Sequence, residues 1–220
     1  MMADRAFTEI EYIRPMEIEA RSMEIIRQEL SERGVTLDPV QAATVMRCIH
    51  SSADFDYVRT LRFSENAVER GITLLKAGAT IVTDTNMVLA GINKRALDRC
   101  KSRAICYMAD PRIAAEAKKR GVTRAAVSME AASRLPGPVM LAIGNAPTAL
   151  LSVYEMIKSG RWIPDFLIGV PVGFVNVVAS KERIMSTPVP YIVNAGRKGG
   201  SNVAAAIVNS LLYQIEGSRL

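Results

Sequence analysis

Five short apolar runs, separated by helical segments, are the feature that most constrains the fold of this chain. Each run ends in small or polar residues, and the five are Thr80–Thr83, Ala104–Met108, Val139–Ile143, Phe166–Val170 and Tyr191–Val193. Helical patterns lie between or after most of them, namely Pro111–Arg120, Arg124–Ser133, Pro147–Ser159 and Ser201–Ile215. Strands that alternate with helices predict a mostly parallel sheet buried on both faces. We therefore expect a three-layer α/β/α fold with a roughly five-stranded sheet.

A helical segment is predicted ahead of the sheet. The expected helices run over about Ile18–Arg33, from Asp38-Pro39 through His50, near Phe55–Leu61, and over Asn66–Lys76 with Ser64 as the N-cap. The chain shows no repeat of 20–50 residues, no low-complexity tract and no long linker. We expect a single domain over residues 1–220, of which residues 1–11 form a loose lead.

Composition narrows the class of partner. No segment approaches the ~18 consecutive apolar residues of a membrane span, and the N-terminus lacks a signal-peptide core, so we expect a cytoplasmic protein that binds no membrane. Three cysteines without a Cys-x-x-Cys pair and a single histidine argue against a disulfide framework and a metal site. The net charge of +6 comes from scattered Lys and Arg, so nucleic acid is only weakly indicated, and an anionic small molecule explains the excess equally well. We expect a small-molecule partner and no nucleic acid.

His50 is the only histidine in the chain, which makes it the natural candidate for acid–base chemistry near neutral pH. Ala42, Val45, Met46 and Ile49 precede it at helical spacing, and the following polar residues suggest that the helix stops there. His50 would then lie in the last helical turn, where the helix dipole favours imidazolium. The alternative is a histidine at the margin of the core, bonded to a neighbouring backbone group.

Ser22 lies among apolar neighbours on one side of the first predicted helix, together with Ile18 and Ile25. A hydroxyl in that position either bonds back to its own helix or is presented to a ligand. Spacing alone leaves both alternatives open.

The turns that follow the predicted strands are rich in polar residues and glycine. They read Asp84-Thr85-Asn86, Asp110-Pro111-Arg112, Gly144-Asn145-Ala146-Pro147-Thr148, Pro171-Val172-Gly173-Phe174 and Asn194-Ala195-Gly196-Arg197-Lys198-Gly199-Gly200-Ser201-Asn202. In open α/β sheets ligands bind beyond the carboxyl ends of the strands, and helix starts offer free N–H groups to anions. Ordinary strand-to-helix turns need the same residues, however. Neither a G-x-G-x-x-G fingerprint nor a P-loop is present, so a dinucleotide or ATP site is not indicated.

The same strings, taken together and in order, resemble the precorrin-8X methylmutases. The resemblance runs from about Tyr12 to Leu212. It is carried by Arg47-Cys48-Ile49-His50-Ser51-Ser52-Ala53-Asp54, Lys76-Ala77-Gly78-Ala79, Asp110-Pro111-Arg112, Thr123-Arg124-Ala125-Ala126, Ala142-Ile143-Gly144-Asn145-Ala146-Pro147-Thr148-Ala149-Leu150, Pro171-Val172-Gly173-Phe174-Val175 and Gly199-Gly200-Ser201.

This resemblance implies an isomerase of corrin (vitamin B12) biosynthesis. Such enzymes move a methyl group between adjacent ring C carbons of precorrin-8X, or of its cobalt complex, by a suprafacial 1,5-sigmatropic shift that gives hydrogenobyrinate or cobyrinate. It implies no cofactor, a tetrapyrrole-derived substrate, and a homodimer with the sites near the subunit interface.

By the same resemblance, His50 is the general acid, and Ser22 and Arg124 contact the substrate. Five further contacts are expected from their places in the turns after the strands: Thr85, Asn145, Thr148, Ser201 and Asn202.

Two other classes stay open at the level of sequence. One is a different anion-binding α/β enzyme in which Gly196–Ser201 cradles a phosphate. The other is a corrinoid-binding carrier that does not turn its ligand over.

Overall fold

One six-stranded sheet forms the middle of the molecule. The computed structural model describes residues 10–216. Within them the strands are β1 (Leu61–Phe63), β2 (Thr80–Thr83), β3 (Arg103–Cys106), β4 (Val139–Ile143), β5 (Phe166–Gly169) and β6 (Tyr191–Asn194). Their spatial order is β1-β6-β5-β4-β2-β3; β1 pairs antiparallel with β6, and all other pairs are parallel. The expected mostly parallel sheet is confirmed, with one additional strand at its edge.

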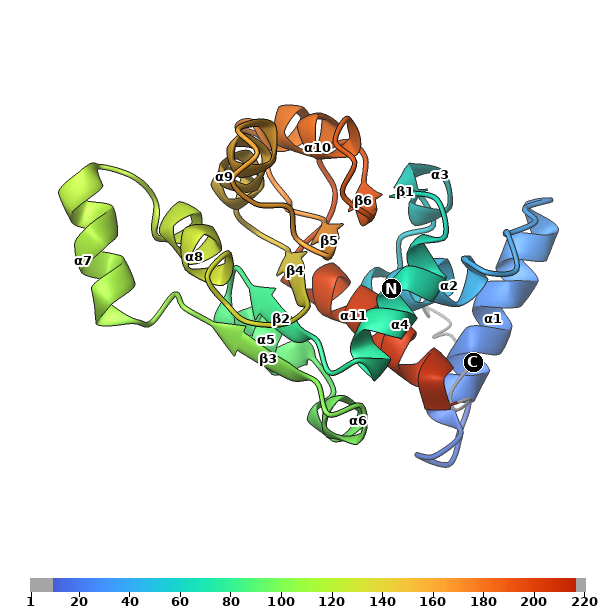
Figure 1. Cartoon of the computed structure of the whole chain (residues 1–220). Helices are drawn as coiled ribbons and strands as arrows, with labels where there is room; N and C mark the ends of the chain where they lie inside the picture. The colour runs from blue at the N-terminus through green and yellow to red at the C-terminus, as the bar shows by residue number, and fades with distance from the viewer. Residues whose placement is uncertain (1–9, 217–220) are drawn as a thin grey trace, which may run out of the picture.

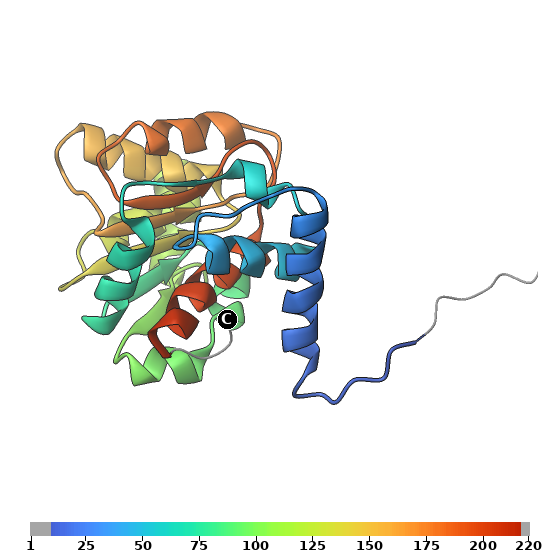
Figure 2. The same cartoon turned by 90° about the vertical axis from the view of Figure 1, so that its right-hand side faces the viewer.

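Helices cover both faces of this sheet (Figure 1). One face carries α8 (Arg124–Ala132), α9 (Pro147–Lys158) and α10 (Val177–Met185), with α7 (Pro111–Arg120) packed against α8. The other carries α2 (Ala42–Ser52), α4 (Ala67–Lys76), α5 (Asn86–Gly91), α6 (Lys94–Arg99) and α11 (Ser201–Glu216). The remaining two are α1 (Ile18–Glu32), which lies against α2 at one side of the molecule (Figure 2), and the single turn α3 (Tyr57–Thr60). The three-layer α/β/α arrangement is confirmed, and no helix within residues 10–216 is long and apolar enough to cross a bilayer.

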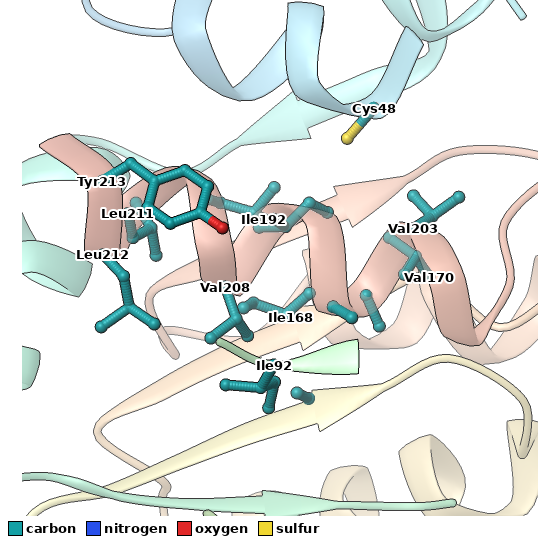
Figure 3. Close-up of a cluster of buried hydrophobic side chains, with 14 of the residues drawn as sticks. Cys48, Ile92, Ile168, Val170, Ile192, Val203, Val208, Leu211, Leu212 and Tyr213 are labelled. Carbon is teal, nitrogen blue, oxygen red and sulfur yellow. The ribbon is translucent and has the colours of Figure 1, made fainter. Parts of the chain in front are cut away.

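The C-terminal helix α11 is the centre of the larger core. Val203, Val208 and Leu211 are fully buried and lie next to Ile168 and Ile192 of β5 and β6, as Figure 3 shows. Cys48 of α2 approaches the same cluster from above, and its thiol pKa is raised by complete burial. Because α11 packs against both α2 and the sheet, it holds the end of α2 in a defined place relative to the strands.

Several predicted boundaries in the N-terminal half are wrong. The helix expected near Phe55–Leu61 is only the turn α3, and the chain then enters β1. Ser64 does not cap α4; its hydroxyl accepts the backbone N–H of Tyr191 at 2.8 Å, which fastens the end of β1 to β6. The helix expected from Asp38-Pro39 begins at Ala42; the Asp38 carboxylate accepts the N–H groups of Val40 and Gln41 in the turn that precedes it.

The prediction also left out two helices between β2 and β3. The short helices α5 and α6 were not expected, because each has six residues, too few for an apolar pattern to repeat at helical spacing. Each begins at a side-chain cap, Thr85 or Asn93. β3 ends at Cys106 rather than Met108, because Tyr107 already starts the turn that leads into α7.

The order of the strands contains a switch point between β2 and β4. After β2 the chain turns to α5 on one face, whereas after β4 it turns to α9 on the other. The loops that leave the two strands therefore turn to opposite faces of the sheet, and the crevice expected of an open α/β sheet lies at the carboxyl ends between them. Ligands of open α/β sheets bind at such a point.

Candidate functional site

The loop after β4 is pinned to the end of β2 by a buried carboxylate. Asp84 accepts N–H bonds from Gly144, Asn145 and Ala146 at 2.9, 2.8 and 2.7 Å. Burial raises the pKa of this carboxyl above its usual value, and the three N–H bonds oppose that shift. Asp84 thus shapes the crevice at the switch point while its own oxygens are occupied. Sequence reasoning missed its role, although its place directly after a buried strand was the available signal.

Thr85 and Ser201 connect the end of β2 to the start of α11. Their hydroxyl oxygens lie 3.0 Å apart, and the Thr85 oxygen also accepts the N–H of Val88 as the N-cap of α5. Gly144 packs against the same point, since a Cβ there would lie 2.7 Å from the Cα of Ser201. Two of the residues expected to contact the substrate, Thr85 and Ser201, are therefore brought together at the switch point.

His50 lies in the last turn of α2, as expected, and its side chain is exposed. The helix ends at Ser52, and Ala53 follows in the left-handed conformation with φ 53°. Asn202 at the start of α11 donates from Nδ2 to the carbonyl of Ser51 at 3.1 Å. The candidate acid is thereby fastened beside the helix start that follows β6, and exposure argues against a histidine held in the core margin.

Lys198 makes a second link between the same two segments. Its ammonium bridges Asp54 and Asp56, with Nζ–Oδ2 distances of 2.7 and 2.5 Å. The two carboxylates raise the pKa of Lys198 to about 12, and Lys198 together with Arg59 lowers the pKa of Asp56. Half of the Lys198 side chain, 49%, remains exposed, so the charge can face a ligand. Lys198 was not among the predicted site residues. Asp54 and Lys198 lie far apart in the chain, so residue spacing gave no sign of this ion pair.

Arg124 and Thr148 lie on the other side of the switch point. Arg124 is exposed at the first position of α8, and its Nη1 donates to the carbonyl of Met108 at 3.0 Å. Thr123, the N-cap of α8, donates to the hydroxyl of Thr148 in the first turn of α9 at 2.9 Å. Asn145 is exposed in the loop just before that turn. These side chains lie on the β4 side of the switch point.

Ser22 is set apart from this group. Its hydroxyl donates to the carbonyl of Ile18 in its own helix at 2.8 Å, the first of the two alternatives left open by the sequence. Within residues 10–216, no hydrogen bond joins it to the residues at the strand ends.

The loop after β5 adds an apolar surface to the same edge. Phe174 and Val175 are 82% and 79% exposed, and Val172 is also exposed. The guanidinium of Arg197 lies 5.5 Å from the centre of the Phe174 ring, and the N–H of Gly173 donates to the carbonyl of Arg197. Apolar area and positive charge are therefore adjacent beside the residues that follow β6.

The part of the chain that the structure describes contains no ready set of metal ligands. There, no three His, Cys, Asp or Glu side chains are grouped so that they could hold an ion. The chemistry open to the described side chains at this edge is proton transfer by His50 and the binding of an anionic, partly apolar molecule.

Comparison with known proteins agrees with this geometry. The family model for CbiC, precorrin-8X methylmutase, matches residues 17–214. Cobalt-precorrin-8 methylmutase of Priestia megaterium is 40% identical over 199 residues, 90% of this chain and 88% of that protein. Precorrin-8X methylmutase of Pseudomonas aeruginosa is 40% identical over 211 residues, 94% of this chain and 100% of that protein. The crystal structure of the Thermus thermophilus precorrin-8X methylmutase superposes with a TM-score of 0.82 at 36% identity and covers 91% of this chain and 98% of that one.

Proposed function

Because the chain belongs to the precorrin-8X methylmutase family, the isomerases of corrin biosynthesis, we propose that it carries out its methyl transfer with His50 as the general acid. The methyl group moves between adjacent ring C carbons of precorrin-8X or cobalt-precorrin-8, which gives hydrogenobyrinate or cobyrinate. The shift is a suprafacial 1,5-sigmatropic migration within the macrocycle.

The chemistry of the migration defines what the protein has to supply. In a sigmatropic shift the new C–CH₃ bond forms as the old one breaks, so no nucleophile is required. The product is an isomer of the substrate, so a proton donated by His50 is balanced by a proton that leaves another position of the macrocycle. The side chains have to hold the ring in one orientation, protonate it, and stabilise the charge that develops.

The single observation that carries this proposal is the position of His50. The only histidine of the chain is exposed at the carboxyl end of α2, and the Asn202–Ser51 hydrogen bond joins that end to the start of α11. Exposure at that place leaves the imidazole accessible to a bound macrocycle, which a proton donor has to contact. An ordinary core histidine would have no reason to be exposed there.

The substrate itself is a large ring with acetate and propionate groups around an apolar centre, and the crevice offers both kinds of partner. We assign Arg124, Arg197 and Lys198 to its carboxylates, and the ring of Phe174 to its apolar face. Ser22 keeps acceptor lone pairs for a substrate group even while it donates to Ile18. The remaining assigned contacts are Thr85, Asn145, Thr148, Ser201 and Asn202.

We also propose that the protein acts as a cytoplasmic homodimer with two-fold symmetry and with the two sites near the interface. The exposed apolar residues Met87, Val172, Phe174 and Val175 near the strand ends support such an interface, because a monomer rarely leaves several of them uncovered at one edge. Light scattering should give twice the chain mass. A monomer mass together with full activity would exclude the dimer.

Replacement of His50 tests the mechanism. His50→Asn should abolish conversion of the substrate, followed by its absorption spectrum, while the protein stays folded and keeps most of its affinity for the corrinoid product. The lost interaction is one made on the way to the transition state, so kcat falls and binding survives. Both the metal-free and the cobalt-containing substrate should be assayed, because relatives of equal identity carry both names.

The control is a variant in which a smaller side chain at position 50 leaves a cavity that free imidazole can enter. His50→Ala with added imidazole should recover part of the rate, because free imidazole can then supply the proton. A folded His50→Ala protein that is merely less stable but turns over normally would contradict the proposal. Tight product binding by a wild-type protein that leaves both substrates unchanged would indicate a corrinoid carrier instead.

A further inference from the structure

A fully buried lysine lies behind the crevice and takes no part in the chemistry described above. Lys181 belongs to α10, and its side chain has 0% exposure. Its ammonium donates to two backbone carbonyls, those of Gly196 and Lys198, at 2.8 Å each. Burial lowers its pKa to about 8. A buried ammonium is costly for the fold unless its donors are paired, and here the two carbonyls accept from it.

The two carbonyls belong to the turn between β6 and α11. Asn194 at the end of β6 also donates from Nδ2 to the carbonyl of Lys198, at 2.7 Å, so that one oxygen receives two donors. On the far side of the turn, Gly199 lies so close to the backbone of Val170 that a Cβ would lie 2.0 Å from its oxygen. The turn is therefore held from both ends, and Lys181 supplies the only charged group among the donors that bind its carbonyls in the described structure.

The same turn reaches the segment that carries His50. The Lys198 side chain extends from it to Asp54 and Asp56, just after the end of α2. Asn202, which follows the turn, donates to the carbonyl of Ser51. A continuous set of contacts thus runs from the buried ammonium, through the backbone of the turn, to the residues on either side of the helix end.

We infer that Lys181 is a positioning residue, which fixes the turn after β6 and through it places His50 against the crevice. The inference rests on the proposed function only in that His50 matters for the reaction. Lys181 touches no substrate. Loss of its two N–H bonds would loosen the turn, release Lys198 from Asp54 and Asp56, and leave the imidazole without a defined position.

The single histidine makes this testable without any substrate. Only one imidazole Cε1–Hε1 signal is expected in the NMR spectrum of a tag-free protein, and it reports on His50 directly. Lys181→Met keeps the length of the side chain and removes the donors. At fixed pH we expect this variant to shift and broaden the His50 signal, whereas Lys119→Met, at an exposed position of α7, should leave it in place. Lys181→Arg, which retains donors, should restore it in part.

Kinetics then separates positioning from simple loss of stability. In the folded fraction of Lys181→Met, kcat should fall by about tenfold or more, a larger factor than the rise in KM that follows from the release of Lys198. Should Lys181→Met fail to fold, Lys198→Met removes the ion pairs with Asp54 and Asp56 at the surface end of the same set of contacts. This variant should shift the His50 signal as well. An unchanged His50 signal in a folded Lys181→Met protein, or in Lys198→Met, would overturn the inference. An active His50→Asn enzyme would overturn the mechanism instead and leave the NMR result standing.

Discussion

Asp84 offers the sharpest test of how the crevice is built. Its carboxylate accepts three backbone N–H groups, those of Gly144, Asn145 and Ala146. Truncation to alanine leaves them without an acceptor, at a cost of about 1–3 kcal/mol for each one that stays buried. Water can reach the exposed Asn145, and relief from burying a charge offsets part of the loss. We expect Asp84→Ala to lower the free energy of unfolding by about 3–5 kcal/mol.

Asp84→Asn is the matched variant of nearly the same shape. Its amide oxygen can replace Oδ2 and accept from Asn145 and Ala146, but its NH₂ group faces the N–H of Gly144. One bond is lost and the buried charge is removed, so the expected loss is only about 1–2 kcal/mol.

The pH dependence of wild-type stability tests the direction in which burial moves the pKa of Asp84. Burial raises the pKa of Asp84, so the native state binds this proton more tightly than the unfolded chain does. The stability that the group contributes is therefore fully present below its unfolded-state pKa and is lost as the pH rises through the folded-state pKa. The gap between wild type and Asp84→Asn should narrow as the pH rises from about 4 towards neutrality.

Urea unfolding followed by the fluorescence of Trp162, the only tryptophan, measures all three proteins over that pH range. An Asp84→Ala protein within about 1 kcal/mol of wild type would show that the three N–H bonds do not hold the loop. A gap that widens as the pH rises would refute the sign of the pKa shift.

Two further predictions concern the walls of the crevice. Arg124→Ala should weaken binding of the corrinoid product by about tenfold or more yet change the free energy of unfolding by less than about 1 kcal/mol, because within residues 10–216 the exposed guanidinium donates only to the Met108 carbonyl. Arg124→Lys should recover part of the affinity, and raised salt should weaken wild-type binding. Unchanged product affinity in a titration would remove Arg124 from the site. Gly144→Ala should cost about 1–3 kcal/mol and most of the activity, because its Cβ would meet the backbone of Ser201. In Gly71→Ala the added Cβ would meet the side-chain end of Leu211 at 2.8 Å instead of backbone, so the cost should be smaller. Equal losses in parallel urea titrations would contradict this interpretation of Gly144.

The local pattern of the sequence was enough to predict most of the sheet and its helices. Val139–Ile143 is a continuous apolar run, and it forms β4 with the expected bounds. Asp110-Pro111 begins α7 through a side-chain cap, and the helix of His50 ends at Ser52, within the polar stretch that was expected to stop it. Such features are local, since a buried strand and a capped helix each depend on the residues within a few positions. β1 escaped prediction because a three-residue edge strand shows no period of its own; only its pairing with β6 defines it.

The arrangement of the site was decided by the tertiary structure alone. Its links join residues far apart in the chain, 60 positions between Asp84 and Gly144, 116 between Thr85 and Ser201, and 151 between Ser51 and Asn202. Residue spacing cannot predict such contacts, because they form only when the strand order β6-β5-β4-β2 brings the ends of parallel strands to one edge of the sheet. The sequence therefore indicated His50 as a candidate acid, while only the packing of α2 on α11 determined what lies beside it.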